Sequence, residues 1–220
     1  MIFFTVSEND IVFLKHQWNG LISFYTSDIS LHNSTFRMLK DKYSEKSRFY
    51  HNLIHIKLLL DLYETLKDQI QERDAIRFSI WFHDVVYDTK RNDNEEESAR
   101  LAFETLGGLN VNAKTIKLVQ ELILATKDHD GRTFSEDAKL FLDMDLAILG
   151  MSREMYEEYS KAIREEYSWV PELTYRKGRK KILESFMDRE KIYFTAVMQK
   201  RFEEQARRNI NEEIQSLEVQ

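Results

Sequence analysis

The chain has no cysteine, only one proline and only six glycines among its 220 residues. The absence of cysteine excludes disulfides and removes thiolates from the possible metal ligands. A β-sandwich or β-barrel needs many turns, so the scarcity of proline and glycine favours long helices instead. We therefore expect an all-α protein.

Two further absences concern location and partners. No run of about 18 apolar residues occurs, so no membrane span is expected. The N-terminus lacks the basic region, apolar core and cleavage site of a signal peptide. The formal net charge of −6 gives no general attraction for nucleic-acid polymers. We expect a cytoplasmic protein without membrane or nucleic-acid partners. The sequence leaves open whether the protein forms an oligomer.

Helical spacing of apolar residues and good N-cap residues predict helices along most of the chain. They cover 7–25, 34–43, 48–66, 74–86, 95–106, 112–125, 135–149, 152–169, 175–187 and 188–217. The loops at 107–112 and 127–133 are too short to divide the chain. We expect one domain over 1–220, with the helices of 7–43 and of 175–217 packed onto the core.

Polar residues that can bind metals interrupt several of these apolar segments. His83 and Asp84 follow Trp81 and Phe82, and His55 lies on the apolar stripe of its helix. Asp145 lies in a further apolar run. Burying such groups is costly unless they are paired or bound to a metal. One shared divalent ion would satisfy all four, whereas any one histidine alone is more often a core residue with its own partner.

The segment His51-Asn52-Leu53-Ile54-His55 has the spacing of the zinc-protease motif H-E-x-x-H. That motif needs a catalytic glutamate at its second position, and Asn52 occupies it here. A protease mechanism is therefore excluded, and one of the two histidines is free for another role.

His55, the His83-Asp84 pair and Asp145 resemble the H…HD…D signature of the HD-domain metal-dependent phosphohydrolases. The segment Tyr50–His55 is also similar to the Y-H-N-x-x-H segment of cyclic-nucleotide phosphodiesterases, which belong to the same superfamily. The resemblance implies a helical domain with its metal site in the helix core, His51 as general acid and His55 as ligand. It extends, within a bacterial group of predicted phosphohydrolases, through Asn94-Glu95, Ala125-Thr126, 142–146 and 206–209.

The chain departs from that family at one position. Two-metal phosphodiesterases carry a further histidine three residues after the HD aspartate, where this chain has Tyr87. We therefore expect one metal ion. Asp143 and Asp145 point to opposite sides of a helix, so only one can be a ligand. The Asp-x-Asp-x-Leu pattern of the superfamily favours Asp145.

Other residues are candidates for supporting roles. Glu95 could orient or deprotonate a water, although an acid at a helix start is equally expected there. His129 could contact the substrate or a second metal, although a solvated loop histidine is the more common case. Arg48, placed one helical turn before His51, is the first candidate for a bidentate phosphate contact. Weaker candidates, which more often form surface ion pairs, are Arg164, Arg179 and Arg207.

Together these features predict a metal-dependent phosphohydrolase that acts on a small phosphorylated metabolite or nucleotide. The mixed nitrogen and oxygen ligands suit Mn, Fe, Co, Ni, Zn or Mg and select weakly among them. A non-catalytic nucleotide-binding domain is the alternative. A di-iron oxygenase of the same fold is a third, but it needs two metals, and Tyr87 counts against it.

Overall fold

The computed structural model describes residues 3–129 and 135–218, and within these ranges the chain forms α-helices and short 3₁₀ turns but no strand. The prediction of an all-α protein is thus confirmed. The helices are α1 (Glu8–Ile22), α2 (Ile29–Tyr43), α3 (Leu53–Leu66), α4 (Arg73–Phe82), α5 (Asn94–Gly108), α6 (Ala113–Ala125), α7 (Glu136–Asp145), α8 (Arg153–Glu166), α9 (Glu172–Met187) and α10 (Ala196–Glu218). The 3₁₀ turns are η1 (Lys67–Gln69) and η2 (Leu146–Gly150).

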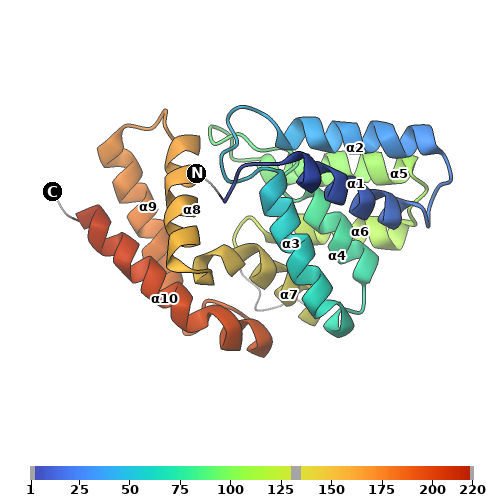
Figure 1. Cartoon of the computed structure of the whole chain (residues 1–220). Helices are drawn as coiled ribbons and strands as arrows, with labels where there is room; N and C mark the ends of the chain where they lie inside the picture. The colour runs from blue at the N-terminus through green and yellow to red at the C-terminus, as the bar shows by residue number, and fades with distance from the viewer. Residues whose placement is uncertain (1–2, 130–134, 219–220) are drawn as a thin grey trace.

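The helices form two groups that share one core. Helices α1 to α6 lie on one side and α8 to α10 on the other, with α7 and η2 between them (Figure 1). Helix α6 packs against α5 and α4, and α10 packs against η2 and α9. A single cluster of buried apolar side chains runs through both groups, from Trp18 and Trp81 to Tyr193 and Ile210. The junction between the groups is therefore part of the core.

The contact between η2 and α10 depends on a glycine. A Cβ atom added to Gly150 would lie 2.5 Å from Cβ and 2.6 Å from the carbonyl oxygen of Phe202. The Asn209 amide holds the same contact by donating hydrogen bonds to the carbonyls of Leu149 and Met151. Because η2 follows directly on Asp145, this packing also fixes the end of α7.

The start of α3 differs from the prediction, which began that helix at residue 48. Asn52 is the N-cap, and its side chain accepts a hydrogen bond from the backbone N–H of Ile54. Asn is among the strongest N-cap residues, because its short side chain replaces the missing intrahelical acceptor. His51 and Arg48 therefore lie in the turn before the helix and not on its first turn.

Other boundaries differ in the same manner. Helix α2 begins five residues earlier than predicted, at Ile29, because the Asp28 carboxylate accepts from two backbone N–H groups. Helix α8 ends at Glu166 and α10 begins only at Ala196, so residues 188–195 are not helical. Within the predicted loop at 127–133, residues 127–129 are not helical, and residues 130–133 lie outside the described residues.

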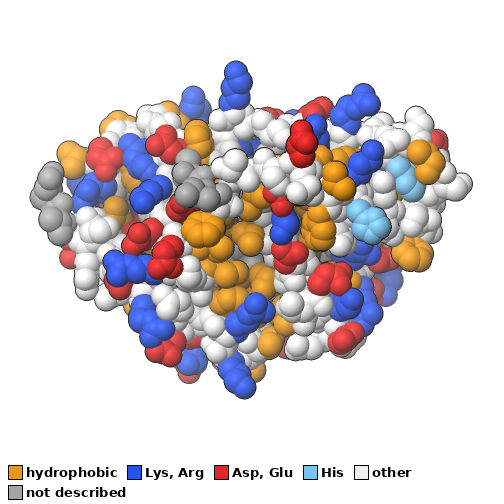
Figure 2. Space-filling view, viewed as in Figure 1, with side chains coloured by type: hydrophobic (Ala, Val, Ile, Leu, Met, Phe, Trp, Pro, Cys, Tyr) orange, Lys and Arg blue, Asp and Glu red, His pale blue; other side chains and the backbone are white. Residues whose placement is uncertain are grey.

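The surface carries charges of both signs, and apolar side chains gather in the middle of one face, over the junction between the two helix groups (Figure 2). Among the described residues, no helix combines the length and the apolar character that a bilayer crossing requires.

Candidate metal centre and cavity

Two histidines and two aspartates from three separate segments meet in the core. His55 comes from the first turn of α3, His83 and Asp84 directly follow α4, and Asp145 ends α7. The two histidines are 1% exposed, and the side chains of Asp84 and Asp145 are 19% and 13% exposed. Helix α4 stops at Phe82, four residues before the end that the sequence predicted at residue 86, and this places His83 and Asp84 just beyond the helix.

The distances within this cluster match those between ligands of one ion. The Nε2 atoms of His55 and His83 are 2.9 Å apart. Asp145 Oδ1 lies 3.2 and 3.5 Å from these two nitrogens, and Asp84 Oδ2 lies 3.6 and 3.0 Å from them. Two atoms held about 2.1 Å from one ion at tetrahedral or octahedral angles are separated by about 3.0–3.4 Å. His55, His83 and Asp145 form a group that could hold a metal ion, and Asp84 adds a further oxygen.

The imidazole of His83 is oriented by a backbone contact. Its Nδ1 lies 3.1 Å from the carbonyl oxygen of Ile80. A carbonyl oxygen can only accept, so Nδ1 carries a proton and Nε2 is the nitrogen that faces the cluster. Such a contact to the second ring nitrogen is typical of histidines that bind metals.

The charge states of the cluster follow from burial and from the neighbouring groups. Burial alone would raise the pKa of Asp84 and of Asp145, but the adjacent His83 lowers both, so each pKa lies below its usual value. Burial lowers the pKa of His55, which favours the neutral imidazole that binds metals. Burial also acts on His83, but the two carboxylates outweigh it and raise the pKa of His83. The cluster is thus made of two carboxylates, one neutral imidazole and one protonated imidazole, and His83 can coordinate a metal only after it loses its Nε2 proton.

Asp143 has a different role. It is fully buried, and its carboxylate accepts hydrogen bonds from the backbone N–H groups of Phe194 and Thr195 and from the Thr195 hydroxyl. Burial raises the pKa of Asp143 to about 6 in spite of these bonds. Asp143 therefore ties α7 to the segment before α10, and Asp145 faces the histidines, as the sequence pattern favours.

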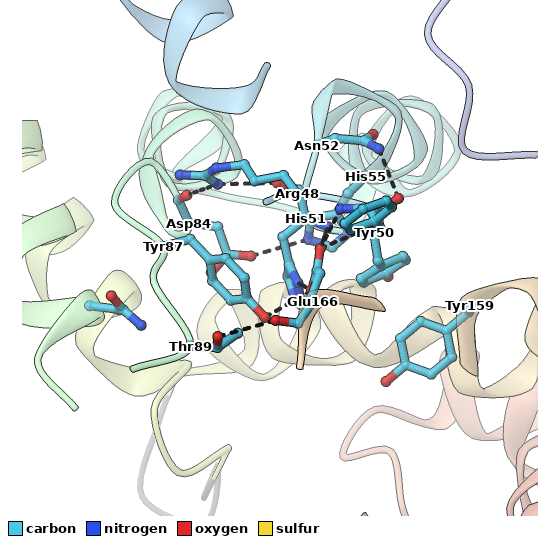
Figure 3. A network of polar contacts seen from close by, with 12 residues as sticks. Arg48, Tyr50, His51, Asn52, His55, Asp84, Tyr87, Thr89, Tyr159 and Glu166 are labelled. Atoms are coloured by element: carbon cyan, nitrogen blue, oxygen red, sulfur yellow. Dashed lines mark hydrogen bonds and ion pairs between the residues drawn. The ribbon is translucent and has the colours of Figure 1, made fainter. Parts of the chain in front are cut away.

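His51 lies beside the cluster and is held by Glu166, the last residue of α8 (Figure 3). One oxygen of Glu166 accepts from the backbone N–H groups of Phe49, Tyr50 and His51, at 2.7–2.9 Å. The other oxygen accepts from His51 Nδ1, at 2.7 Å, and from the hydroxyl of Tyr87, at 2.9 Å. The Tyr87 ring also stacks on the His51 ring, with centroids 4.2 Å apart. This leaves Nε2 as the ring nitrogen of His51 available to a neighbouring cavity.

The protonation of His51 depends on this carboxylate. Burial lowers the pKa of His51, but the charge of Glu166 and its hydrogen bond raise it further, so that the net pKa lies above its usual value. The pKa of Glu166 is lowered below its usual value, since His51 and the backbone N–H groups outweigh its burial. His51 and Glu166 thus form a buried ion pair. Sequence analysis missed Glu166, because it stands in a run of charged residues at the end of a helix.

A cavity of about 890 Å³ adjoins the cluster, and His51, Asp84 and Asp145 are among the residues that line it. Glu95, in the first turn of α5, also lines it, and burial raises the pKa of this carboxyl. His129 lines it as well, with Nε2 2.9 Å from Asp145 Oδ2 and a backbone φ of 46°. The structure therefore brings Glu95 and His129 to the cavity that the metal candidates share.

Arg48 is placed differently from the expectation that it reaches over the mouth of the site. Its side chain is fully buried and donates hydrogen bonds to the carbonyl oxygens of His51, Asp84 and Val85. The physical reason is the start of α3 at Leu53, which removes Arg48 from the helix face of His55. In this position Arg48 joins the two segments that carry His51 and Asp84, and it does not line the cavity.

Of the three weaker arginine candidates, only Arg179 lines the cavity, and both of its terminal branches are engaged with Glu213 or Tyr159. Arg164 binds Glu172 and two carbonyls at the turn between α8 and α9. Arg207 binds Glu203 and the carbonyls of residues 189 and 190. Neither of these two reaches the cavity.

Comparison of the chain with protein-family models, with curated proteins and with solved structures found no match. The chemistry of the residues around this cavity therefore carries the functional conclusion.

Proposed function

We propose that this chain is a metal-dependent phosphohydrolase of the HD-domain type that acts on a small phosphorylated metabolite or nucleotide. One observation carries the proposal: a histidine held by a buried carboxylate faces the same cavity as a cluster with metal-ligand spacing. The sequence resemblance to the H…HD…D signature and to the Y-H-N-x-x-H segment supports it. His51 then has the role of the first histidine of that segment.

The residues that would hold one divalent ion are His55, His83, Asp84 and Asp145. Their fit rests on their mutual distances, their burial and their mixed nitrogen and oxygen donors. When bound, Mn, Fe, Co, Ni, Zn or Mg would supply Lewis acidity toward a phosphoryl oxygen and lower the pKa of a water.

His51 supplies the proton to the leaving group. Its Nδ1–H is bound to Glu166, and the raised pKa keeps the second proton on Nε2, toward the cavity. In the hydrolysis of a phosphate ester, a water oxygen bonds to phosphorus as the bond from phosphorus to the leaving oxygen breaks. The leaving oxygen takes the Nε2 proton of His51. Glu95, a half-buried carboxylate on the same cavity, is placed to accept the proton that the water loses.

The first test is metal content together with phosphate release. Purified wild-type protein is loaded with each of the candidate metals and assayed on a panel of phosphate esters. We expect His83→Ala and Asp84→Ala to lose both bound metal and activity. His16→Ala is the matched control, because His16 lies exposed on α1. Equal metal content in all four proteins would overturn the assignment of the cluster. Bound metal without turnover of any ester would replace the enzyme proposal with a binding domain.

A further inference from the structure

The cavity is much larger than the metal cluster requires. Its volume of about 890 Å³ lies in the range of sites that enclose whole drug-sized ligands. The acidic and imidazole groups make up one part of its lining. Further walls come from η2, α8 and α9, which belong to the C-terminal part of the chain. A substrate that fills the cavity must therefore have a large part beyond its reacting phosphoryl group.

These further walls are mainly apolar and aromatic. Leu146, Ile148 and Leu149 of η2 and Ile163 of α8 line them. Aromatic rings complete them, from Tyr159, Tyr167, Trp169, Tyr175 and Phe186. Two apolar side chains on the cavity, Trp169 and Ile182, stay 51% and 53% exposed. Aromatic walls favour a flat ring, which can stack on them or meet them edge-on.

The cations on the cavity are already engaged. Lys127 lies 2.5 Å from a carboxylate oxygen of Glu96 and 2.8 Å from the carbonyl of Asn92. Arg179 pairs with Glu213, and Arg189 donates to the carbonyl of His129. Binding of a di- or triphosphate needs several cations directed at the additional phosphates. Besides His51, which is paired with Glu166, the described walls offer these three, each with a partner of its own, alongside acidic groups such as Asp84 and Glu95.

We infer that the substrate is a phosphate monoester with a single phosphoryl group, and that its alcohol part carries an uncharged aromatic or heteroaromatic ring bound against η2, α8 and α9. This inference rests on the proposed function, since the phosphoryl group is placed at the cluster. Nucleoside monophosphates belong to this class, and nucleoside triphosphates do not. The ring contributes binding energy at a distance from the reacting bond.

Two matched comparisons test the ring and the single phosphate. Adenosine 5′-monophosphate and ribose 5-phosphate share the same leaving oxygen and differ by the base. We expect the metal-loaded wild-type protein to prefer the former in kcat/KM by at least about tenfold, which corresponds to about 1.4 kcal/mol. We expect a preference of similar size over adenosine 5′-triphosphate. Equal values for the first pair, or a preference for the triphosphate, would overturn the inference.

A substitution on the apolar wall tests its location. Ile182→Glu places a charge on the cavity side of α9, where the exposed position tolerates it, and Val12→Glu on α1 is the matched control. For adenosine 5′-monophosphate, Ile182→Glu is expected to raise KM about five- to tenfold, with kcat nearly unchanged. Ribose 5-phosphate should show little change, and so should Val12→Glu with either ester. Wild-type KM values in Ile182→Glu would overturn the assignment of this wall.

Equilibrium binding separates the failure of this inference from the failure of the proposed function. Calorimetric titration of the metal-loaded His51→Ala protein compares the same three compounds without relying on turnover. If the wild type releases no phosphate from any ester, the hydrolase proposal fails. Tighter binding of adenosine 5′-monophosphate, by about tenfold, would still support the ring site. Equal binding of all three compounds would overturn it.

Discussion

The substitution Glu166→Gln tests the role of the carboxylate that holds His51. A glutamine keeps one carbonyl oxygen, which can still accept from the three backbone N–H groups of residues 49–51. The other carboxylate oxygen becomes an amide NH₂, which only donates. It would then face the Nδ1–H of His51 and the Tyr87 hydroxyl, both of which donate to that oxygen in the wild type. We expect the fold to persist and the proton on His51 to be lost or moved.

The expected change in the pKa of His51 and in the rate follows from the negative charge that Glu166→Gln removes. Burial lowers the pKa of His51, and Glu166 is the first of the groups that raise it. Without that charge the largest cause that raises the pKa is gone, and the pKa of His51 should fall. A general acid works only below its own pKa, so the loss of activity with rising pH should move to lower pH by the same amount. Near neutral pH the rate should fall about 10²–10⁴-fold.

The assay is the pH dependence of kcat/KM between about pH 5 and 9, on whichever ester the wild type cleaves. The matched control is Glu165→Gln, which removes the same charge from the exposed neighbouring position. Nuclear magnetic resonance titration of the His51 ring gives its pKa directly, without turnover, and a melting curve shows that the variant is folded. A folded Glu166→Gln protein with a wild-type pH profile and rate would refute the role assigned to this pair.

Four further changes separate the metal cluster from the scaffold around it. Asp145→Asn should remove bound metal, as measured by elemental analysis, whereas Asp143→Asn should retain it and lower the melting temperature, because Asp143 binds only the segment before α10. Arg48→Met should lower the free energy of unfolding, measured in urea, by about 3–5 kcal/mol, because the substitution leaves three carbonyl oxygens without their buried donor. A loss below about 1 kcal/mol would contradict this role of Arg48. Gly150→Ala should cost about 1–3 kcal/mol in the same assay, since its Cβ would collide with Phe202, and an unchanged value would show that α10 can shift.

The cluster of four ligand candidates could be predicted because each member breaks a local rule. His83 and Asp84 follow directly on the buried run 78–82 at the end of α4, and His55 lies on an apolar stripe. A polar group in such a place needs a hydrogen-bond partner, an opposite charge or a metal ion. The fold class could be predicted for a related reason, since helical periodicity and scarce turn residues are properties of short windows of sequence.

The errors at helix ends have a local cause that the sequence does contain. Asn52 is a strong N-cap, and the apolar periodicity that continues back to Arg48 conceals it. The consequence is large, because moving the helix start by five residues turns Arg48 from a surface cation into a buried donor to three carbonyls. Whether a residue near a helix end can contact a phosphate therefore depends more on which residue caps the helix than on the spacing of residues in the sequence.

The position of Glu166 has no such local signal. It is 115 residues from His51, and its burial results from the packing of α8 against the turn before α3. The ligand candidates come from α3, α4 and α7, whereas the carboxylate that orients His51 and the apolar cavity walls come from α8, α9 and η2. The proposed metal ligands and the carboxylate that orients His51 thus come from different parts of the chain. Changes that loosen α8 should therefore impair the protonation of His51 while the four ligand candidates stay in place.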